Sequence, residues 1–316
     1  MAQRDALYGK LVVLVGGSGF FGTHIAQDLL ERGARLRIAS RNPETSFTLK
    51  PLANLGQLQF ARCDVTRRDS LAASLQGADA VVYLVGTFES NQKALQATGA
   101  GNAAEIAAEQ GAQSFVYVSA IGADPTDEES GYAATKGLGE QLVLEAFPKA
   151  TIVRPSIIFG EDDAFVNMFA DLVSKLPALP VFGPDSEIQP VWVDDAAAAV
   201  VGALADPLAH GGKTYELAGP ERIRMDELHR RIAQAQGRER TFLPVPDFAS
   251  RIFAALPGTP MNSDQWLLLK RGSVASDKLP GIEKLGVDPK PLSLFLDRWM
   301  VRYRRNGRFS NRVSRA

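Results

Sequence analysis

The feature that most constrains this chain is a glycine-rich turn directly after an apolar run. Leu11–Val15 is followed by Gly16, Gly19 and Gly22, and a helix-like stretch begins at the last of these glycines. A strand, a turn with glycines three residues apart and a helix, in this order, are typical of the first βαβ unit of a dinucleotide-binding fold. Gly16 would permit the tight turn, Gly19 the approach of a pyrophosphate, and Gly22 close packing of the helix. A glycine-rich turn without a ligand is the alternative interpretation.

Up to residue 155, short apolar runs alternate with longer amphipathic stretches. The runs that predict strands are 11–15, 36–39, 57–61, 80–85, 115–119 and 151–154, and the stretches that predict helices are 22–32, 70–75, 94–110 and 132–147. Several runs are apolar throughout, as expected for strands buried between two helical layers. We therefore predict an α/β fold with a Rossmann-type doubly wound parallel sheet, formed by residues 1–155 with parts of 185–220 completing the sheet.

The pattern changes after Pro155, and for residues 156–316 we predict a smaller C-terminal α+β cap followed by a basic tail. The predicted helices here are 165–176, 194–204, 225–236 and 291–303, and the predicted strands are 188–193 and 213–217. Short segments interrupted by prolines follow Phe242. Short segments interrupted by prolines favour a small cap that packs on the main domain over an independent domain.

The end of the second predicted strand distinguishes the two nicotinamide cofactors. NAD-binding proteins usually place Asp or Glu there, where it accepts a hydrogen bond from the ribose 2′-hydroxyl. This chain has Ser40 and Arg41 instead. A guanidinium can bind a 2′-phosphate through two hydrogen bonds, whereas a carboxylate would repel it. The sequence therefore predicts NADP(H), with NAD(H) less favoured, and a solvated surface arginine remains the alternative interpretation of Arg41.

Further cofactor contacts are predicted at the start of the first helix and after the later strands. They are Phe20, Phe21, Asp64, Val65, Val85, Gly86, Pro155 and Ser156. Asp64 is expected near the adenine amino group, and the small residue Gly86 would let the cofactor pass the fourth strand. Pro155 and Ser156 would border the nicotinamide carboxamide.

The candidate catalytic residues are Ser119, Tyr132 and Lys136. Tyr132 and Lys136 form the only Tyr-x-x-x-Lys in the sequence, on the helix predicted after the fifth strand, and Ser119 ends that strand. Residues four apart share a helix face, so the charge of Lys136 is expected to lower the pKa of the Tyr132 phenol and make it a usable proton donor or acceptor. Alternatively, Tyr132 and Lys136 bind the cofactor ribose without turnover.

Composition argues against several other classes of protein. The net charge of −1 gives no global electrostatic basis for binding nucleic acid. The single cysteine, Cys63, fits a reducing compartment. The three histidines show no metal-ligand spacing, so no metal is predicted. The sequence shows no apolar signal segment and no run long enough to cross a bilayer, so we predict a soluble, cytoplasmic protein. This prediction allows a peripheral position on the cytoplasmic face of the inner membrane.

The C-terminal end is strongly basic. Residues 302–315 contain six arginines and no acidic residue. A solvated, frayed terminus is the ordinary interpretation. The alternative is that the tail contacts an acidic protein surface or anionic lipid headgroups.

The glycine turn, Tyr132-x-x-x-Lys136 and the predicted sheet together resemble the extended and atypical short-chain dehydrogenase/reductases. Within these, four segments resemble the NADPH-binding accessory subunits of respiratory complex I and their bacterial relatives: 145–169, with its Phe-Pro, Arg-Pro-Ser and Phe-Gly elements, 189–195, 212–220 and 281–286. The resemblance extends over roughly residues 10 to 305. It implies a tightly bound cofactor that serves structure or assembly, with subunits of complex I or of another membrane-associated quinone-pathway complex as partners.

Three functions follow from these observations. The favoured one is an NADP(H)-binding accessory or assembly subunit of complex I or of a quinone-pathway assembly. The alternative is an NADPH-dependent oxidoreductase that reduces a carbonyl or a sugar-nucleotide-like substrate through Ser119, Tyr132 and Lys136. A regulator whose partner binding follows NADPH occupancy is a third hypothesis, without a sequence feature of its own.

Overall fold

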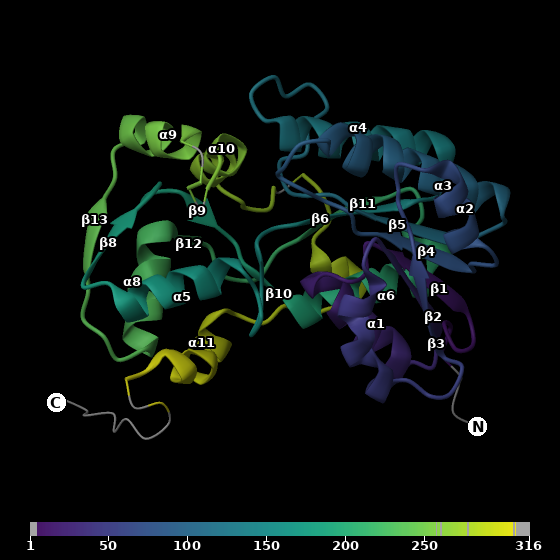
Figure 1. Ribbon diagram of the computed structural model, residues 1–316, viewed down its shortest axis with the longest axis horizontal. Coiled ribbons are helices and arrows are strands. Elements are labelled where there is room, and N and C mark those ends of the chain that lie inside the picture. The colour runs from purple at the N-terminus through teal and green to yellow at the C-terminus, as the bar shows by residue number, and fades with distance from the viewer. Residues whose placement is uncertain (1–4, 257, 260, 277, 306, 308–316) are drawn as a thin grey trace. The chain divides into compact units, whose positions relative to one another are not determined.

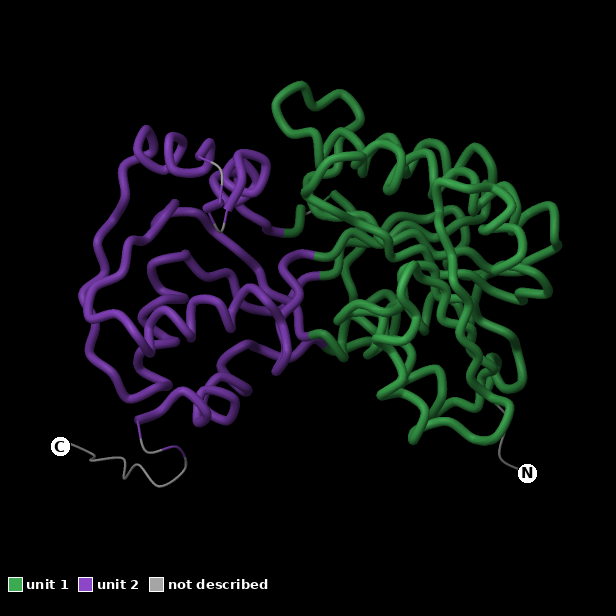
Figure 2. Tube along the Cα trace, viewed as in Figure 1, with its two compact units in different colours: residues 1–155, 193–217, 275–288 green, residues 156–192, 218–274, 289–316 purple. Residues whose placement is uncertain are grey.

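The computed structural model describes residues 5–256, 258–259, 261–276, 278–305 and 307, and the contacts of the chain divide it into two compact units. Figure 2 shows unit 1 (Met1–Pro155, Val193–Leu217 and Ala275–Asp288) in green and unit 2 (Ser156–Trp192, Ala218–Val274 and Pro289–Ala316) in purple. Each unit has its own buried apolar core.

Unit 1 is built on a parallel seven-stranded sheet (Figure 1). Its strands are β1 Leu11–Val15, β2 Arg35–Ser40, β3 Leu58–Arg62, β4 Ala80–Tyr83, β5 Ser114–Val118, β6 Thr151–Pro155 and β11 Thr214–Leu217, in the spatial order β11-β6-β5-β4-β1-β2-β3. Every residue of β1, β4 and β5 is buried, which explains why these runs are apolar on both faces. The strand order reverses between β1 and β4, so a ligand crevice is expected at the carboxyl ends of these two strands.

Helices cover both faces of this sheet (Figure 1). They are α1 Phe20–Glu31, α2 Arg68–Leu75, α3 Gly99–Glu109, α4 Gly131–Ala146, α6 Val193–Ala205 and the short α7 Pro207–His210, with the 3-10 segments η1 Pro43–Leu52 and η3 Ile282–Leu285 and the π segment η2 Lys93–Thr98. α1 packs beside α6 on one face, and α2, α3 and α4 pack together on the other. The predicted Rossmann-type, doubly wound α/β fold is therefore confirmed.

Unit 2 combines short strand pairs with helices, as predicted for a small α+β region (Figure 1). Its strands are β7 Ile158–Phe159, β8 Ala178–Val181, β9 Glu187–Ile188, β10 Val191–Trp192, β12 Ile223–Arg224 and β13 Thr241–Pro244, and its helices are α5 Phe165–Lys175, α8 Met225–Ala235, α9 Asp247–Ala255, α10 Ser263–Arg271, α11 Ser293–Trp299 and the 3-10 segment η4 Met300–Tyr303. The apolar faces of α5, α8 and α11 form its core.

Two predicted elements are wrong in detail. The single strand predicted over 188–193 is two short strands, β9 and β10, which pair with different partners: β9 with β12 and β10 with β7. Pro190 lies between them and has no N–H to donate, so a continuous ladder is interrupted there. The helix predicted over 94–110 begins as the π segment η2 before α3 continues it.

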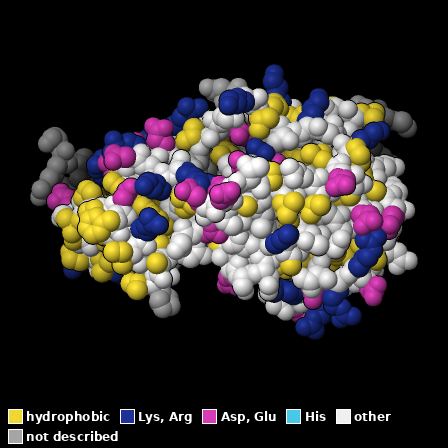
Figure 3. Space-filling model, turned by 90° about the horizontal axis from the view of Figure 1, so that it is seen from above, with side chains coloured by type: hydrophobic (Ala, Val, Ile, Leu, Met, Phe, Trp, Pro, Cys, Tyr) yellow, Lys and Arg dark blue, Asp and Glu magenta, His cyan; other side chains and the backbone are white. Residues whose placement is uncertain are grey.

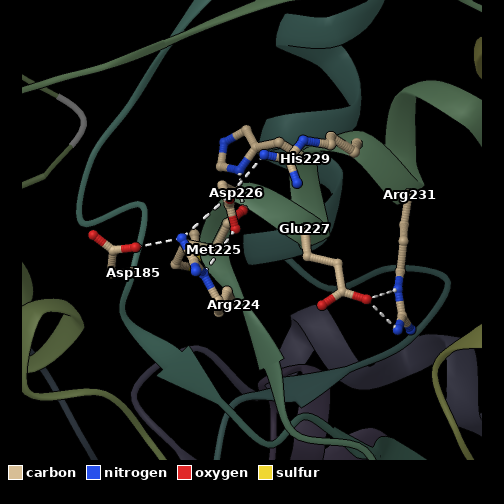
Figure 4. A network of polar contacts seen from close by, with 8 residues as sticks. Asp185, Arg224, Met225, Asp226, Glu227, His229 and Arg231 are labelled. Carbon is tan, nitrogen blue, oxygen red and sulfur yellow. Dashed lines mark hydrogen bonds and ion pairs between the residues drawn. The ribbon is translucent and has the colours of Figure 1, made fainter.

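A polar network covers the start of α8 in unit 2 (Figure 4). Arg224 pairs with Asp185 and Asp226, and on the same helix Arg231 pairs with Glu227. His229 is buried beneath them, and its Nδ1 lies 2.6 Å from the Met225 carbonyl oxygen. Burial lowers the pKa of His229, so the ring is neutral at physiological pH. The Arg224–Asp185 pair is exposed and contributes little stability.

The described residues form neither a metal-binding cluster nor a membrane-spanning helix. Within them, no group of three or more His, Cys, Asp or Glu side chains could hold a metal ion. No helix in the same ranges is both long and apolar enough to span a bilayer.

Candidate functional site

The glycine turn connects β1 to α1 at the strand-order reversal. Gly16 has a positive φ of 80°, and a Cβ there would lie 2.8 Å from the Val85 side chain, so this position needs glycine. A Cβ on Gly22 would lie 2.5 Å from the Gly17 carbonyl oxygen, because α1 begins in contact with the turn itself. Both glycines therefore serve the close packing of strand, turn and helix.

Gly19 differs from these two glycines. Its φ of −84° is open to any residue, and a Cβ would meet no protein atom within 4 Å. Gly19 is the N-cap of α1, and the first turn of this helix has neither a side-chain cap nor an acidic residue. The unpaired N–H groups at the helix start therefore lie beside open space that an anion fits.

A cavity of about 660 Å³ opens beside this turn. It is lined by Gly16, Ser18, Gly19, Ala39, Ser40, Arg41, Asn42, Thr45, Cys63, Val65, Leu84, Val85, Gly86, Thr87, Glu89, Ser90, Asn91 and Leu95. These residues come from the carboxyl ends of β1, β2, β3 and β4 and from the segments that follow them. Ser40 is buried, and its hydroxyl has no hydrogen-bond partner among the described residues. A buried hydroxyl without a partner beside a cavity is expected where a polar ligand binds.

Two arginines extend this cavity at the ends of β2 and β3. Arg41 and Arg62 line a neighbouring pocket of about 480 Å³ together with Asn42, Cys63 and Asp64. Neither guanidinium forms a hydrogen bond or an ion pair within the described ranges. Sequence reasoning identified Arg41 but missed Arg62, because only the register of β2 on β3, which pairs Ser40 with Arg62, places it there.

Asp64 shares this pocket with the two arginines. Its carboxylate accepts hydrogen bonds from the Thr66 hydroxyl, at 2.7 Å, and from the Thr66 backbone N–H, at 3.0 Å. These bonds, with a smaller contribution from the charge of Arg41, lower the pKa of Asp64. Asp64 is therefore held as a hydrogen-bond acceptor in the lining of this pocket.

The opposite wall of the cavity is the segment after β4. Val85, Gly86 and Asn91 line it. Among the non-glycine residues that the structure describes, Asn91 alone has a positive φ, 69°. Backbone conformations of this kind cluster at ligand-binding segments. The buried side chain of Gln96, on the π segment η2, accepts a hydrogen bond from the Thr87 N–H and donates one to Thr135 on α4. The wall is thereby tied to the helix that carries Tyr132 and Lys136.

Lys136 lies directly behind this wall and is buried. Its Nζ donates to the Val118 carbonyl at 2.8 Å and to the Val85 carbonyl at 3.3 Å, and it lies 5.9 Å from the centre of the Tyr132 ring. Phe88 stacks on Tyr132, with ring centres 4.2 Å apart.

The prediction that Lys136 lowers the pKa of Tyr132 is wrong for this structure. Desolvation raises the pKa of Tyr132 to about 12 and lowers the pKa of Lys136 to about 7, although the charge of Glu140 opposes the second shift. Burial therefore outweighs the attraction between a lysine charge and a phenolate, an effect that helix spacing alone does not reveal. At neutral pH the phenol stays protonated.

The remaining predicted site residues do not line this cavity. Ser119 follows β5, and its buried hydroxyl has no partner within the described part of the chain. Phe20 and Phe21 open α1 without lining the cavity, and Pro155 ends β6. Ser156 falls in unit 2, where its hydroxyl donates to the Ser273 carbonyl.

The burial of Lys136 predicts a pH-dependent stability. In the folded chain its pKa is about 7, whereas an unfolded lysine titrates near 10.5. Between these values the unfolded state binds more protons, so the free energy of unfolding should rise as the pH increases from about 7 to about 9. Urea unfolding of Lys136→Met should show a shallower rise than the wild-type protein. The exposed Lys149→Met is the control that should keep the wild-type slope, and identical slopes for Lys136→Met would contradict the assignment.

Comparison with known proteins agrees with this geometry. Residues 16–169 match a family model described as NAD(P)H-binding. The chain is 31% identical to the alpha subcomplex subunit 9 of mouse mitochondrial NADH dehydrogenase (ubiquinone) 1 over 307 residues, covering 92% of this chain and 80% of the relative. It is 30% identical to the Arabidopsis thaliana protein of the same name, over 98% of this chain and 82% of the relative. A Caulobacter vibrioides ceramide reductase is 30% identical over 245 residues, 75% of this chain and 74% of the relative.

Solved structures show the same fold at lower identity. The epimerase Mth375 of Methanothermobacter thermautotrophicus superposes with a TM-score of 0.72 at 18% identity, over 94% of this chain and 93% of that one. The Thermus thermophilus UDP-glucose 4-epimerase, solved with NAD, gives 0.70 at 20% identity, over 93% and 98%. Together with the glycine turn and its cavity, these similarities show that the chain belongs to the NAD(P)H-binding extended short-chain dehydrogenase/reductases and is related over almost its whole length to the alpha subcomplex subunit 9 of respiratory complex I.

Proposed function

We propose that the cofactor of this chain is NADP(H), held at the carboxyl ends of β1, β2 and β4. In this proposal the N-terminus of α1 receives the pyrophosphate beside Gly19, and Asp64 accepts a hydrogen bond from the adenine amino group. The open space at Gly19 and the unpartnered Ser40 hydroxyl support it. When bound, the nicotinamide supplies hydride chemistry, and the chain supplies binding and orientation.

Preference for the phosphorylated cofactor rests on Arg41, with Arg62 beside it. Both guanidiniums line one pocket, next to the Ser40 end of β2, where the adenosine ribose of a dinucleotide is held. Two cations and a hydroxyl match the charge and the acceptors of a 2′-phosphate. Both bonds from Thr66 go to Oδ1 of Asp64, which leaves Oδ2 to accept a hydrogen bond from the adenine amino group.

Arg41→Glu should weaken NADPH binding about a hundredfold and NADH binding by less than about threefold, because it removes charge-assisted hydrogen bonds and adds repulsion only where the phosphate lies. Isothermal titration calorimetry with both cofactors measures the difference. Arg35→Glu, which reverses an exposed charge at the other end of β2, is the matched control. Equal losses for both cofactors would show that Arg41 does not recognise the 2′-phosphate.

We further propose that the bound cofactor serves an accessory or assembly role in respiratory complex I or a related quinone-pathway complex at the inner membrane. The observation that carries this proposal is the state of the Tyr132–Lys136 pair. The Lys136 ammonium is engaged by two main-chain carbonyls, and the pKa of Tyr132 is about 12. A phenol with this pKa is poorly suited to exchange a proton at neutral pH. The similarity to a complex I subunit along nearly the whole chain supports the same role.

Two measurements on the full chain test this role. Mass spectrometry of nucleotide released by denaturation should find NADPH that has survived gel filtration. An affinity-tagged chain should also recover complex I subunits from solubilised membranes, and Arg41→Glu should recover fewer of them if the cofactor stabilises the assembled form. Freely exchanging cofactor and no recovered subunits would refute the accessory role.

A reductase is the second candidate function. It is supported by the unpartnered hydroxyl of Ser119 and by the similarity to a protein named ceramide reductase. In this case Ser119 would donate a hydrogen bond to a carbonyl oxygen and Tyr132 would supply the proton. The distinguishing result is carbonyl-dependent NADPH oxidation that Tyr132→Phe abolishes while cofactor binding remains.

A further inference from the structure

Large exposed apolar side chains concentrate in one short stretch of unit 2. They are Leu243, Phe248, Ile252 and Leu256, with exposed fractions of 54%, 71%, 60% and 54%. In Figure 3, hydrophobic side chains gather on the side of the molecule that carries α9 and α10, with Lys and Arg side chains beside them. A continuous apolar area of this kind is uncommon on the surface of a soluble protein and marks a site of interaction.

Apart from Leu243 on β13, the apolar area follows one face of α9. Phe248 and Ile252 lie four residues apart, and Leu256 continues the stripe just beyond the helix. The opposite face is already packed: Ser250 and Ala254 are buried, and Phe253 stacks on Phe182 with ring centres 5.0 Å apart. The outer stripe therefore contributes nothing to the core of unit 2, and its exposure needs another explanation.

The charged side chains around this face favour binding to a negatively charged surface. Arg251 lies on the exposed side of α9, and the last turn of the neighbouring α10 carries Lys270 and Arg271. The local carboxylates are Asp247, which is paired with Lys270 at 2.6 Å, and Asp264. The three cations thus outnumber the two carboxylates, although the whole chain has a net charge of −1.

The form of the surface distinguishes a bilayer from a protein partner. Protein interfaces usually combine an apolar centre with about one hydrogen bond per 100–200 Å². The outer stripe of α9 instead offers Phe248, Ile252, Ala255 and Leu256 without a polar group among them, and its basic residues stand at the border. An amphipathic helix with this distribution lies in the headgroup region with its apolar side chains in the acyl layer. Because no described helix is suited to span a bilayer, the contact would be peripheral.

We propose that the outer face of α9, formed by Phe248, Ile252 and Leu256 together with the exposed Leu243 of β13 and bordered by Arg251, Lys270 and Arg271, docks this protein onto an anionic lipid bilayer. The proposal does not depend on the cofactor, since every residue it uses lies in unit 2 and every cavity-lining residue lies in unit 1.

Vesicle co-sedimentation of the full chain tests this surface. The wild-type protein should bind vesicles of equal parts phosphatidylcholine and phosphatidylglycerol, and bind pure phosphatidylcholine vesicles more weakly. The double variant Phe248→Ser with Ile252→Ser should bind the anionic vesicles at least about tenfold more weakly. Arg251→Glu should lower binding to the anionic vesicles only. Leu176→Ser with Leu294→Ser, which changes exposed leucines of unit 2 outside this face, is the matched control and should bind as the wild type does.

Each alternative occupant has its own result. Unchanged binding of the Phe248/Ile252 variant would assign lipid binding to another basic segment, such as the C-terminal arginines, and overturn the proposal. A wild-type chain that ignores vesicles and sediments as a dimer, with the variant sedimenting as a monomer, would assign the face to a second copy and overturn it as well. Unaltered NADPH affinity and thermal midpoint in the variant would show that its loss of binding is not a loss of folding.

Discussion

Gly19→Val is expected to abolish binding of NADPH and NADH alike while leaving the fold intact. The backbone at Gly19 is extended, with a φ of −84°, so a β-branched residue can adopt it without strain. Its Cβ would meet no protein atom within 4 Å, so the valine side chain would extend into the space beside the start of α1. A pyrophosphate bound to the helix N-terminus needs this space. Calorimetry should detect no binding at concentrations about a hundredfold above the wild-type Kd.

Gly22→Ala is the contrasting variant. A Cβ there would lie 2.5 Å from the carbonyl oxygen of Gly17, and backbone atoms cannot move aside as a flexible side chain can. Gly22→Ala should therefore lower the thermal midpoint, which Gly19→Val should leave near the wild-type value. Measurements of stability and of cofactor binding therefore distinguish the roles of the two glycines. Cofactor binding by a stable Gly19→Val protein would show that the dinucleotide lies elsewhere.

Much of unit 1 could be predicted because its signals are local. The run Leu11–Val15 is apolar on both faces because β1 is central, and the glycines after it follow from the contact between turn and helix. Tyr132 and Lys136 could also be placed on one face of α4, because residues four apart on a helix lie on the same face. Periodicity and turn chemistry act within a few residues, and a sequence carries them directly.

The features that could not be predicted depend on residues far apart in the chain. Arg62 joins Arg41 only through the register of an edge strand, which no local pattern encodes. The pKa of Lys136 depends first on its burial, behind the segments that carry the Val85 and Val118 carbonyls, which helix periodicity does not place beside it. Residues Ala275–Asp288 belong to unit 1, where Glu216 accepts hydrogen bonds from the N–H and hydroxyl of Ser276. Burial is a property of the assembled fold, so predictions that depend on it fail first.

The largest loss of stability is expected from Glu140→Gln. Glu140 and Arg154 form a two-point ion pair between α4 and β6, with N–O distances of 2.8 and 2.6 Å and side-chain exposures of 10% and 21%. Gln keeps the size of the side chain but removes the charge, so the guanidinium stays largely buried with only the weaker influence of the Glu216 and Asp124 charges. Breaking a buried pair in this way should cost about 2–4 kcal/mol, the lower part of the range reflecting the partial exposure of Arg154.

An exposed pair of the same chemistry provides the control for this prediction. Arg68 bridges Glu105 and Glu109 between α2 and α3, but these side chains are about half exposed, so Arg68→Gln should leave the urea midpoint unchanged. Glu140→Gln should also lower the pKa of Lys136 further, because the negative charge of Glu140 raises that pKa in the wild-type protein. The pH-dependent rise in stability would then begin at a lower pH than in the wild-type protein. If Glu140→Gln and Arg68→Gln proved equally harmless, the buried pair would not be what joins α4 to β6.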